Sequence, residues 1–129
     1  MNGEYDYEFG VLLDAMENEP HKVNAIVNAD RSILEATNRT GENALRWFAL
    51  ENRFDEVRKL RSLGSTIQEQ TLSEAVGMGN TEMVGLLMEL GAEPNLTSCK
   101  EEMNRKFNQL TSRQKNIIKK HFQDFGFEI

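Results

Sequence analysis

The stretch GNTEMVGLLMELGAEPN, residues 79–95, decides the fold because it describes one short helix with a defined end. The apolar residues at helical spacing in it are Met83, Val84, Leu86, Leu87, Met88 and Leu90. The helix stops at Gly91, where a helix end favours a left-handed residue, and Ala-Glu-Pro-Asn follows. So wide an apolar face on a short helix indicates neighbours on both sides, as in a stack of similar helix pairs.

A related pattern occurs 27 residues earlier in the chain. The segment NALRWFALENRFDEVRKLRSLGS, 43–65, aligns without a gap over QTLSEAVGMGNTEMVGLLMELGA, 70–92. Equivalent positions in this alignment are Asn52 and Gly79, Val57 and Val84, Leu60 and Leu87, and Gly64 and Gly91. A weaker match, shifted by 33 residues, places Leu12 on Leu45. Internal repetition at such a period indicates a repeat architecture.

Helical spacing continues through most of the chain, and no segment alternates as a β-strand would. We therefore expect an all-α fold of four helix pairs, over about 8–17 with 20–30, 43–52 with 54–63, 71–78 with 81–90, and 98–110 with 112–125. Thr81 and Thr111 are expected to cap helices, and Gln114 to complete a capping box with Thr111. Gly64 and Gly91 are expected to adopt the left-handed conformation that ends a helix.

The segment TLSEAVGMGNTEMVGLLMELGAEPN, 71–95, resembles the ankyrin repeat. Its residues on family positions are Leu72, Ala75, Gly79, Glu82, Val84, Leu86, Leu87, Gly91, Ala92 and Asn95. The segment NRTGENAL, 38–45, resembles the hairpin finger and helix start of the family, with Gly41 at the turn. The histidine of the family's Thr-Pro-Leu-His start is missing each time, since the chain reads VLLD, NALR and QTLS.

The resemblance implies an ankyrin-like α-solenoid of stacked helix-turn-helix repeats, within a single domain over 1–129. The repeats are expected at about 8–37, 38–66 and 67–96, followed by a capping helix pair at about 97–129. The second and third repeats are only 27 residues apart, so one hairpin finger is expected to be shortened. Stacked repeats bury their apolar faces against one another, and the residues expected there are Val57, Leu60, Val84, Leu86 and Leu87.

The composition is that of a folded helical domain, with 39% hydrophobic and 28% charged residues. No apolar run reaches the roughly 18–20 residues needed to span a bilayer. The first residues lack the basic and apolar regions of a secretory signal, and we expect a chain complete as printed. A single cysteine, Cys99, cannot form an internal disulfide and favours a reducing compartment. A cytoplasmic location is expected.

Charge is distributed unevenly, within a formal net charge of −6. Residues 1–20 hold six carboxylates and no Lys or Arg, whereas residues 100–120 hold seven cations and two carboxylates. The simplest interpretation of either run is a solvated helix face. An acidic protein favours a basic partner and disfavours nonspecific nucleic-acid binding. We expect neither a nucleic acid nor a membrane as partner, although a nucleic-acid binder using the basic run is a minor alternative.

No catalytic or metal-binding pattern stands out in the chain. The two histidines, His21 and His121, do not combine with Cys99 at a spacing typical of metal ligands. There is no P-loop, H-E-x-x-H or G-x-S-x-G motif. His21 is expected to be packed or half-buried. Cys99 begins a helix whose dipole would lower its thiol pKa, but an isolated cysteine is more often incidental. We expect no enzyme activity, cofactor or metal.

What remains is a surface for another protein. In ankyrin-like stacks the ligand face consists of the finger tips and the exposed face of the inner helices. Transferred position by position, that face comprises Glu17, Asn18, Arg39, Thr40, Glu42, Leu50, Glu51 and Met78. Leu50 and Met78 would be apolar anchors between polar neighbours, as binding hot spots often are. Trp47 falls on a core position of the family and is assigned to packing.

The predicted function is a non-enzymatic protein–protein interaction module, monomeric when free. By analogy of size and charge, it is similar to bacterial ankyrin-type immunity proteins, cytosolic inhibitors that neutralise a toxin or effector domain. The expected partner is a basic protein. The alternative is an adaptor or scaffold, or a host-directed effector, acting in a larger assembly.

Overall fold

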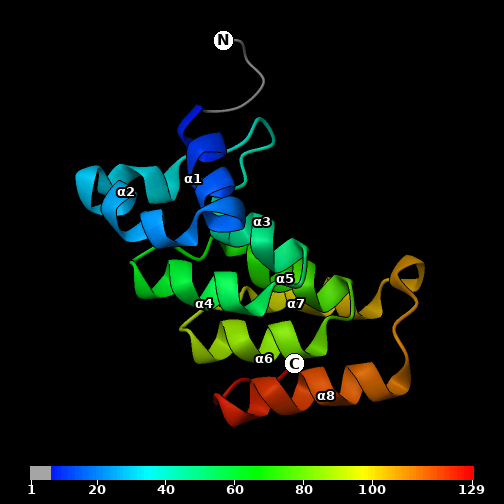
Figure 1. Ribbon diagram of the computed structural model, residues 1–129. Coiled ribbons are helices and arrows are strands. Elements are labelled where there is room, and N and C mark those ends of the chain that lie inside the picture. Colours follow the sequence, from blue (N-terminus) through cyan, green and yellow to red (C-terminus); the bar gives the residue numbers. More distant parts are fainter. Residues whose placement is uncertain (1–6) are drawn as a thin grey trace. The chain divides into compact units, whose positions relative to one another are not determined.

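The computed structural model describes residues 7–129, and within them the chain is helical with no extended sheet (Figure 1). The expected all-α fold is therefore confirmed. The chain divides into two compact units, unit 1 over residues 1–68 and unit 2 over residues 69–129.

Over residues 7–68, unit 1 consists of four α-helices and two short 3-10 helices. They are α1 Tyr7–Asn18, η1 Pro20–Lys22, α2 Val23–Ala29, η2 Arg31–Glu35, α3 Ala44–Leu50 and α4 Phe54–Ser62. Helix α1 packs against α2, η2 and α3, while α3 packs against α4. The largest fully buried side chains of this unit are Leu12, Val23, Val27, Leu45, Phe48, Val57 and Leu60. They fill the space between these helices with apolar atoms, which stabilises the unit.

A tight turn connects η2 to α3 and forms one wall of the site described below. An isolated antiparallel bridge joins Thr37 to Asn43. Gly41 has a φ of 85°, as expected from its position in the turn. The Asn38 Oδ1 atom accepts a hydrogen bond from the backbone N–H of Glu42 at 3.0 Å. The backbone N–H of Asn38 donates to the Glu42 carbonyl at 3.0 Å, so the side chain and the backbone of Asn38 close the turn together.

Asn43 links this turn to α3 and to the segment after α4. Its side chain is buried, and its Oδ1 accepts the backbone N–H of Arg46 at 3.0 Å, which caps α3. Its Nδ2 donates to the carbonyl of Thr66 at 3.0 Å, and its backbone N–H donates to Gln68 Oε1 at 3.2 Å. Asn43 therefore holds the non-helical segment 65–68 in place.

Unit 2 contains two helix hairpins. Its helices are α5 Glu69–Gly77, α6 Thr81–Glu89, α7 Leu96–Asn104, η3 Lys106–Asn108 and α8 Ser112–Asp124. Helix α5 packs against α6 and α7, and α6 packs against α8 (Figure 1). The first helices of the two hairpins, α5 and α7, therefore pack on each other, and so do the second helices, α6 and α8. The fully buried side chains between them include Leu72, Val76, Met83, Val84, Leu87, Cys99, Ile118 and Phe122. The burial predicted for Val57, Leu60, Val84, Leu86 and Leu87 is confirmed.

The two segments aligned by the sequence repeat end their helices in the same backbone conformation. Gly64 and Gly91 have φ values of 107° and 96°, as predicted. After each, the next N–H donates to the carbonyl five residues earlier, at 3.0 Å after Gly64 and 2.9 Å after Gly91. The aligned pair Asn52 and Gly79 is also left-handed, with φ values of 60° and 71°. The two aligned segments therefore share the positions and the backbone conformation of their helix ends.

One predicted helix cap and one predicted helix end are wrong. Helix α6 begins with Thr81 as its first helical residue, so the cap position belongs to Asn80. The helix expected over 98–110 ends at Asn104. The reason is that Asn108 Nδ2 donates to the carbonyl of Glu102 at 2.7 Å and satisfies it from outside the helix. The capping box of Thr111 and Gln114 is present at the start of α8, as predicted.

Gly85 of α6 lies directly beneath the His121 side chain of α8. A Cβ atom added there would lie 2.7 Å from Cε1 of His121 in α8. In an uncrowded helix interior, replacing Gly by Ala stabilises the folded state by about 0.5–1 kcal/mol. We expect Gly85→Ala to lower the free energy of unfolding instead, because the imidazole ring must move away from α6. Urea denaturation monitored by circular dichroism measures the change.

The matched control removes the obstacle. A His121→Ala background removes the three atoms nearest to the added methyl group, so there Gly85→Ala should raise the free energy of unfolding. A Gly85→Ala change that stabilises the chain equally in both backgrounds would contradict this packing.

Candidate functional site

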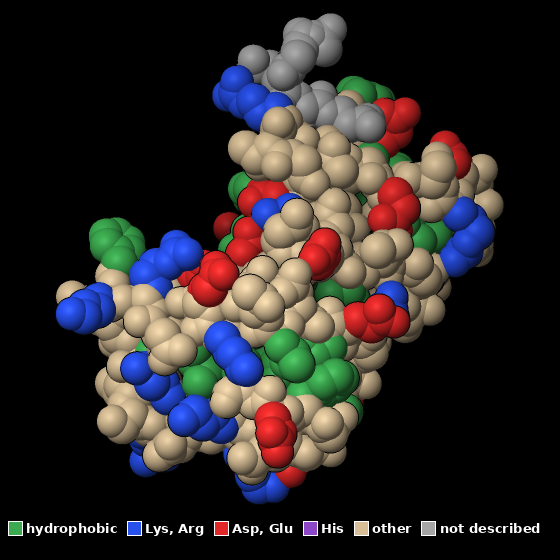
Figure 2. Space-filling view, turned by 180° about the vertical axis from the view of Figure 1, so that it is seen from behind, with side chains coloured by type: hydrophobic (Ala, Val, Ile, Leu, Met, Phe, Trp, Pro, Cys, Tyr) green, Lys and Arg blue, Asp and Glu red, His purple; other side chains and the backbone are tan. Residues whose placement is uncertain are grey.

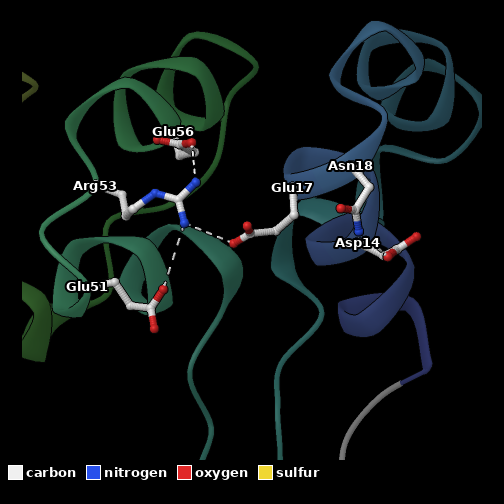
Figure 3. Close-up of polar contacts among 6 residues, drawn as sticks. All are labelled: Asp14, Glu17, Asn18, Glu51, Arg53 and Glu56. Atoms are coloured by element: carbon white, nitrogen blue, oxygen red, sulfur yellow. Dashed lines mark hydrogen bonds and ion pairs between the residues drawn. The ribbon is translucent and has the colours of Figure 1, made fainter.

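Arg53, at the cap position of α4, gathers three carboxylates of unit 1 (Figure 3). Its Nη1 lies 3.0 Å from Glu17 Oε1 and 4.0 Å from Glu51 Oε1, and its Nη2 lies 2.6 Å from Glu56 Oε2. The guanidinium also lies over the Phe48 ring, with Cζ 5.3 Å from the ring centroid. The hydrogen bond to Glu56 is the main cause that raises the pKa of Arg53. Three carboxylates surround one cation, so this surface is negative.

The last turns of α1 add to this negative charge. Asn18 Nδ2 donates to Asp14 Oδ1 at 2.7 Å, and Glu17 extends from the same helix toward Arg53 (Figure 3). No basic residue lies in the last turn of α1. Carboxylates near a helix C-terminus face the negative end of the helix dipole, which is unfavourable. Asp14 and Glu17 are therefore not placed where they would stabilise α1, and a role at the surface is the simpler explanation.

A groove of about 400 Å³ lies between α1 and the turn that precedes α3. Phe9, Leu13 and Trp47 supply its apolar lining. The Phe9 and Trp47 rings meet edge to face, with centroids 6.0 Å apart and planes at 83°. Polar residues of the turn complete the lining: Asn38, Arg39, Thr40 and Glu42. An apolar floor with polar walls is suited to one protruding side chain of a partner.

Glu42 is the carboxylate of this groove. It is half-buried, and its Oε1 accepts a hydrogen bond from Asn38 Nδ2 at 2.8 Å. The Asn38 Oδ1 atom in turn accepts the Thr40 hydroxyl at 2.9 Å. The turn thus holds the Glu42 carboxylate in one orientation at the groove.

Seven of the eight residues predicted for the ligand face lie in unit 1. Glu17 and Glu51 contact Arg53, and Asn18 lies beside them on α1. Arg39, Thr40 and Glu42 line the groove. Leu50 ends α3 and is half-buried, so it is a weaker anchor than predicted. Met78 is 53% exposed and belongs to unit 2, so it is not part of the unit 1 surface.

The sequence analysis did not predict Arg53 and Glu56 as part of the acidic surface, or Trp47 as part of the groove lining. Trp47 does pack against Phe9, as assigned, but it is only half-buried and also lines the groove. The available signal for Arg53 was its position in ENRFDE, 51–56, where one cation stands among three carboxylates. Glu4 and Asp6 of the acidic run lie outside the described residues.

The histidines and the cysteine do not form a reactive centre within residues 7–129. No group of three or more His, Cys, Asp or Glu in this part of the chain could hold a metal ion. His21 is exposed on η1, so the expected packing is wrong, because this short 3-10 helix has no buried residue. The proposed lowering of the Cys99 thiol pKa is also wrong. Burial, and secondarily the charge of Glu102, raises that pKa to about 11.

We therefore expect Cys99 to be unreactive toward a thiol reagent at pH 8 while the chain is folded. Its side chain is fully buried, and a neutral thiol is a poor nucleophile. The pKa is raised on folding, so this thiol favours the folded state below its unfolded pKa of 9.0 and loses that contribution as the pH rises toward 11. Labelling at pH 8 with and without denaturant measures the difference, and the pH dependence of a Cys99→Ser variant is the control. Fast labelling of the folded chain would contradict the burial.

The described residues include no helix that is both long and apolar enough to cross a membrane. Comparison of the chain with protein-family models, with curated proteins and with solved structures finds no match. The function must therefore be inferred from the surfaces described above.

Proposed function

We propose that the chain is a non-enzymatic interaction module that binds a basic protein through the acidic surface of unit 1. The observation that carries the proposal is the cluster of Glu17, Glu51 and Glu56 around the single cation Arg53. Asp14 extends the negative surface along α1. An exposed surface with more carboxylates than it needs for its own ion pairs attracts cationic side chains.

The groove beside this surface supplies the apolar part of the interface. Interfaces combine a buried apolar or aromatic anchor with a polar rim. Here Trp47 and Phe9 provide the apolar floor, while Glu42 and Arg39 provide the rim. A cationic side chain of the partner that enters the groove would meet both the Trp47 ring and the Glu42 carboxylate, and both interactions favour a cation.

The architecture proposed for the whole chain is a small, divergent ankyrin-like solenoid with one shortened finger. Three observations support it. The 37–43 turn carries a β-bridge where a finger is expected, helix ends repeat with the 27-residue period, and in unit 2 equivalent helices pack on one another. Such stacks present preformed surfaces, and a preformed surface loses little conformational entropy on binding.

Within this class, the function favoured is that of a cytoplasmic inhibitor or immunity protein that neutralises a basic toxin or effector domain. The support is the small size, the net charge of −6 and the acidic unit 1 surface. An adaptor or scaffold in a larger assembly is the alternative, because the same surface would serve either role. A free monomer remains part of the proposal.

The proposal is tested by capture experiments with matched variants. The site variant carries Glu17→Gln and Glu51→Gln, and the control variant carries Glu82→Gln and Glu93→Gln on exposed positions of unit 2. Both variants remove two negative charges, so only the location differs. Immobilised wild-type chain should retain a basic protein that the control also retains and the site variant loses.

Kinetics with that protein complete the test. Long-range charge attraction mainly accelerates encounter, so the association rate should fall several-fold in the site variant and fall further as salt rises. A partner that binds the site variant and the wild type equally well, or an association rate indifferent to salt, would remove the basis of the proposal.

A further inference from the structure

Unit 2 presents an isolated aromatic side chain on the connection between α7 and α8. Phe107 lies in η3 and is 89% exposed, more than any other described large hydrophobic residue. In the view of Figure 2, a hydrophobic side chain projects at the left edge, and Lys and Arg side chains lie near it. Phe107 contributes nothing to the core of its own unit, and its whole ring is available as an apolar anchor for a partner.

The connection that carries Phe107 is held in a fixed conformation. Asn108 Nδ2 donates to both the carbonyl and the Oε1 of Glu102, at 2.7 and 3.0 Å. Gln109 adopts a left-handed conformation with a φ of 55°, which is unfavourable for a residue with a side chain. The capping box at Thr111 fixes the other end. The connection that carries Phe107 is therefore held by hydrogen bonds at both ends.

The surroundings of Phe107 are cationic. Arg105 and Lys106 precede it directly, and Lys100 and Lys115 are exposed or half-exposed on the flanking helices. Arg105 pairs with Glu102 at 3.2 Å, but within residues 7–129 no ion pair joins Lys100, Lys106 or Lys115 to a carboxylate. A ligand of this turn must therefore offer an apolar site next to negative charge.

Unit 1 of the same sequence offers that combination. The groove of Phe9, Leu13 and Trp47 is large enough for a phenyl ring, and the acidic surface of α1 and Arg53 adjoins it. Leu13 and Glu17 are four residues apart on α1, so they share one face of that helix. The apolar groove can therefore receive the Phe107 ring, and the acidic surface beside the groove can attract the cations beside Phe107.

We propose that the Phe107 turn of one copy of the chain docks into the Phe9–Trp47 groove of a second copy. Phe107 fills the apolar groove, and Arg105 and Lys106 face Glu42, Asp14 and Glu17 of the other copy. Arg39 lies on the groove wall and opposes these cations, so the cations must approach from the α1 side. The contact is heterologous, since turn meets groove, so a chain of copies keeps one free turn at one end and one free groove at the other and can grow.

The contact does not depend on the proposed partner, although it occupies the same groove. The monomer expected from the sequence is then the form present at low concentration. Association should increase with protein concentration and decrease with added salt, because the charges around the anchor are exposed and screened. A basic partner that binds the groove would compete with the Phe107 turn.

Sedimentation of the full chain over a range of concentrations at low and physiological salt tests the proposal. The wild type should form dimers and longer species at low salt. Phe107→Ala should weaken association roughly 10–30-fold, as loss of an interface hot spot does. Phe125→Ala, which removes another exposed phenylalanine of unit 2, is the matched control and should associate like the wild type.

A mixing experiment tests the direction of the contact. Leu13→Lys places a cation in the groove and should also abolish association, while circular dichroism verifies that the variant is folded. Phe107→Ala retains an intact groove and Leu13→Lys retains an intact turn. A mixture of the two should therefore form a dimer, and nothing larger, at concentrations where each alone is monomeric.

Three results would overturn the inference. The first is a wild-type chain that stays monomeric up to the highest soluble concentration at low salt. The second is association that survives both variants, and the third is a mixture of the variants that stays monomeric. A wild type that is always monomeric leaves the proposal of a basic partner standing, so the two ideas fail separately.

Discussion

Replacing Leu87 by alanine should lower the free energy of unfolding by about 2–5 kcal/mol. Leu87 lies in α6, which packs against α5 and α8, and none of its side chain is exposed (0%). The substitution removes buried apolar atoms, and the close-packed helices cannot move enough to fill the space. Urea denaturation followed by circular dichroism measures the loss.

Met78→Ala is the control for this change. Met78 is 53% exposed at the end of α5, so its truncation should alter the free energy of unfolding by about 0.5 kcal/mol or less. Equal denaturation midpoints for Leu87→Ala and the wild type would contradict the burial of α6.

Asn43→Ala should lower the free energy of unfolding by about 2–3 kcal/mol. The cap of α3 contributes about 1 kcal/mol, and the side-chain hydrogen bond to the Thr66 carbonyl contributes about 1 kcal/mol more. The backbone N–H of Arg46 is also left without its acceptor. Thermal and urea denaturation measure the effect.

Two variants separate the roles of the Asn43 side chain. Asn95→Ala removes an equivalent cap from α7 at an exposed position, so it should cost only about 1 kcal/mol. Asn43→Asp keeps the cap but directs a carboxylate oxygen at the Thr66 carbonyl and at Glu35 Oε1, which lies 3.4 Å from Nδ2 in the wild type. These neighbours raise the pKa of the new carboxyl in the folded state, so its cost should shrink as the pH falls toward about 4, the pKa of an unperturbed Asp, because the folded chain then binds the proton first. An Asn43→Asp variant as stable as the wild type at pH 7 would contradict the network.

The sequence predicted the features that depend on local backbone preference. Gly64 and Gly91 adopt left-handed conformations as expected, because a residue without Cβ is favoured at these helix ends. The capping box of Thr111 and Gln114 was readable for the same reason, since both partners lie within one turn. Helical spacing located the helix pairs because each pair buries one apolar face.

Features that depend on contacts between distant residues were not readable. Arg53 reaches Glu17 across 36 positions, and no local pattern specifies that pairing. The end of α7 at Asn104 depends on Asn108 folding back onto Glu102. The dual role of Trp47 depends on where α1 lies, since Phe9 covers one edge of the ring and leaves the rest in the groove.

The candidate site was predicted in part for a related reason. Transfer from the ankyrin pattern selected carboxylates near helix and turn ends, and unit 1 does bring Glu17 and Glu51 to one arginine. Transfer from the ankyrin pattern could not select Arg53 or Glu56, because ion pairs depend on the positions of side chains in the folded structure. Leu50 was taken as an exposed anchor, but its place at the end of α3 leaves it half-buried.

The central claim is that unit 1 carries the surface that binds a basic partner. Hydrogen–deuterium exchange of the chain, free and bound to the protein that the capture experiment identifies, tests it most directly. The account predicts slower exchange on binding in α1, in the 37–43 turn and in 47–53, with little change in 69–129. Slower exchange confined to unit 2, or no difference in α1 and the 37–43 turn, would contradict it.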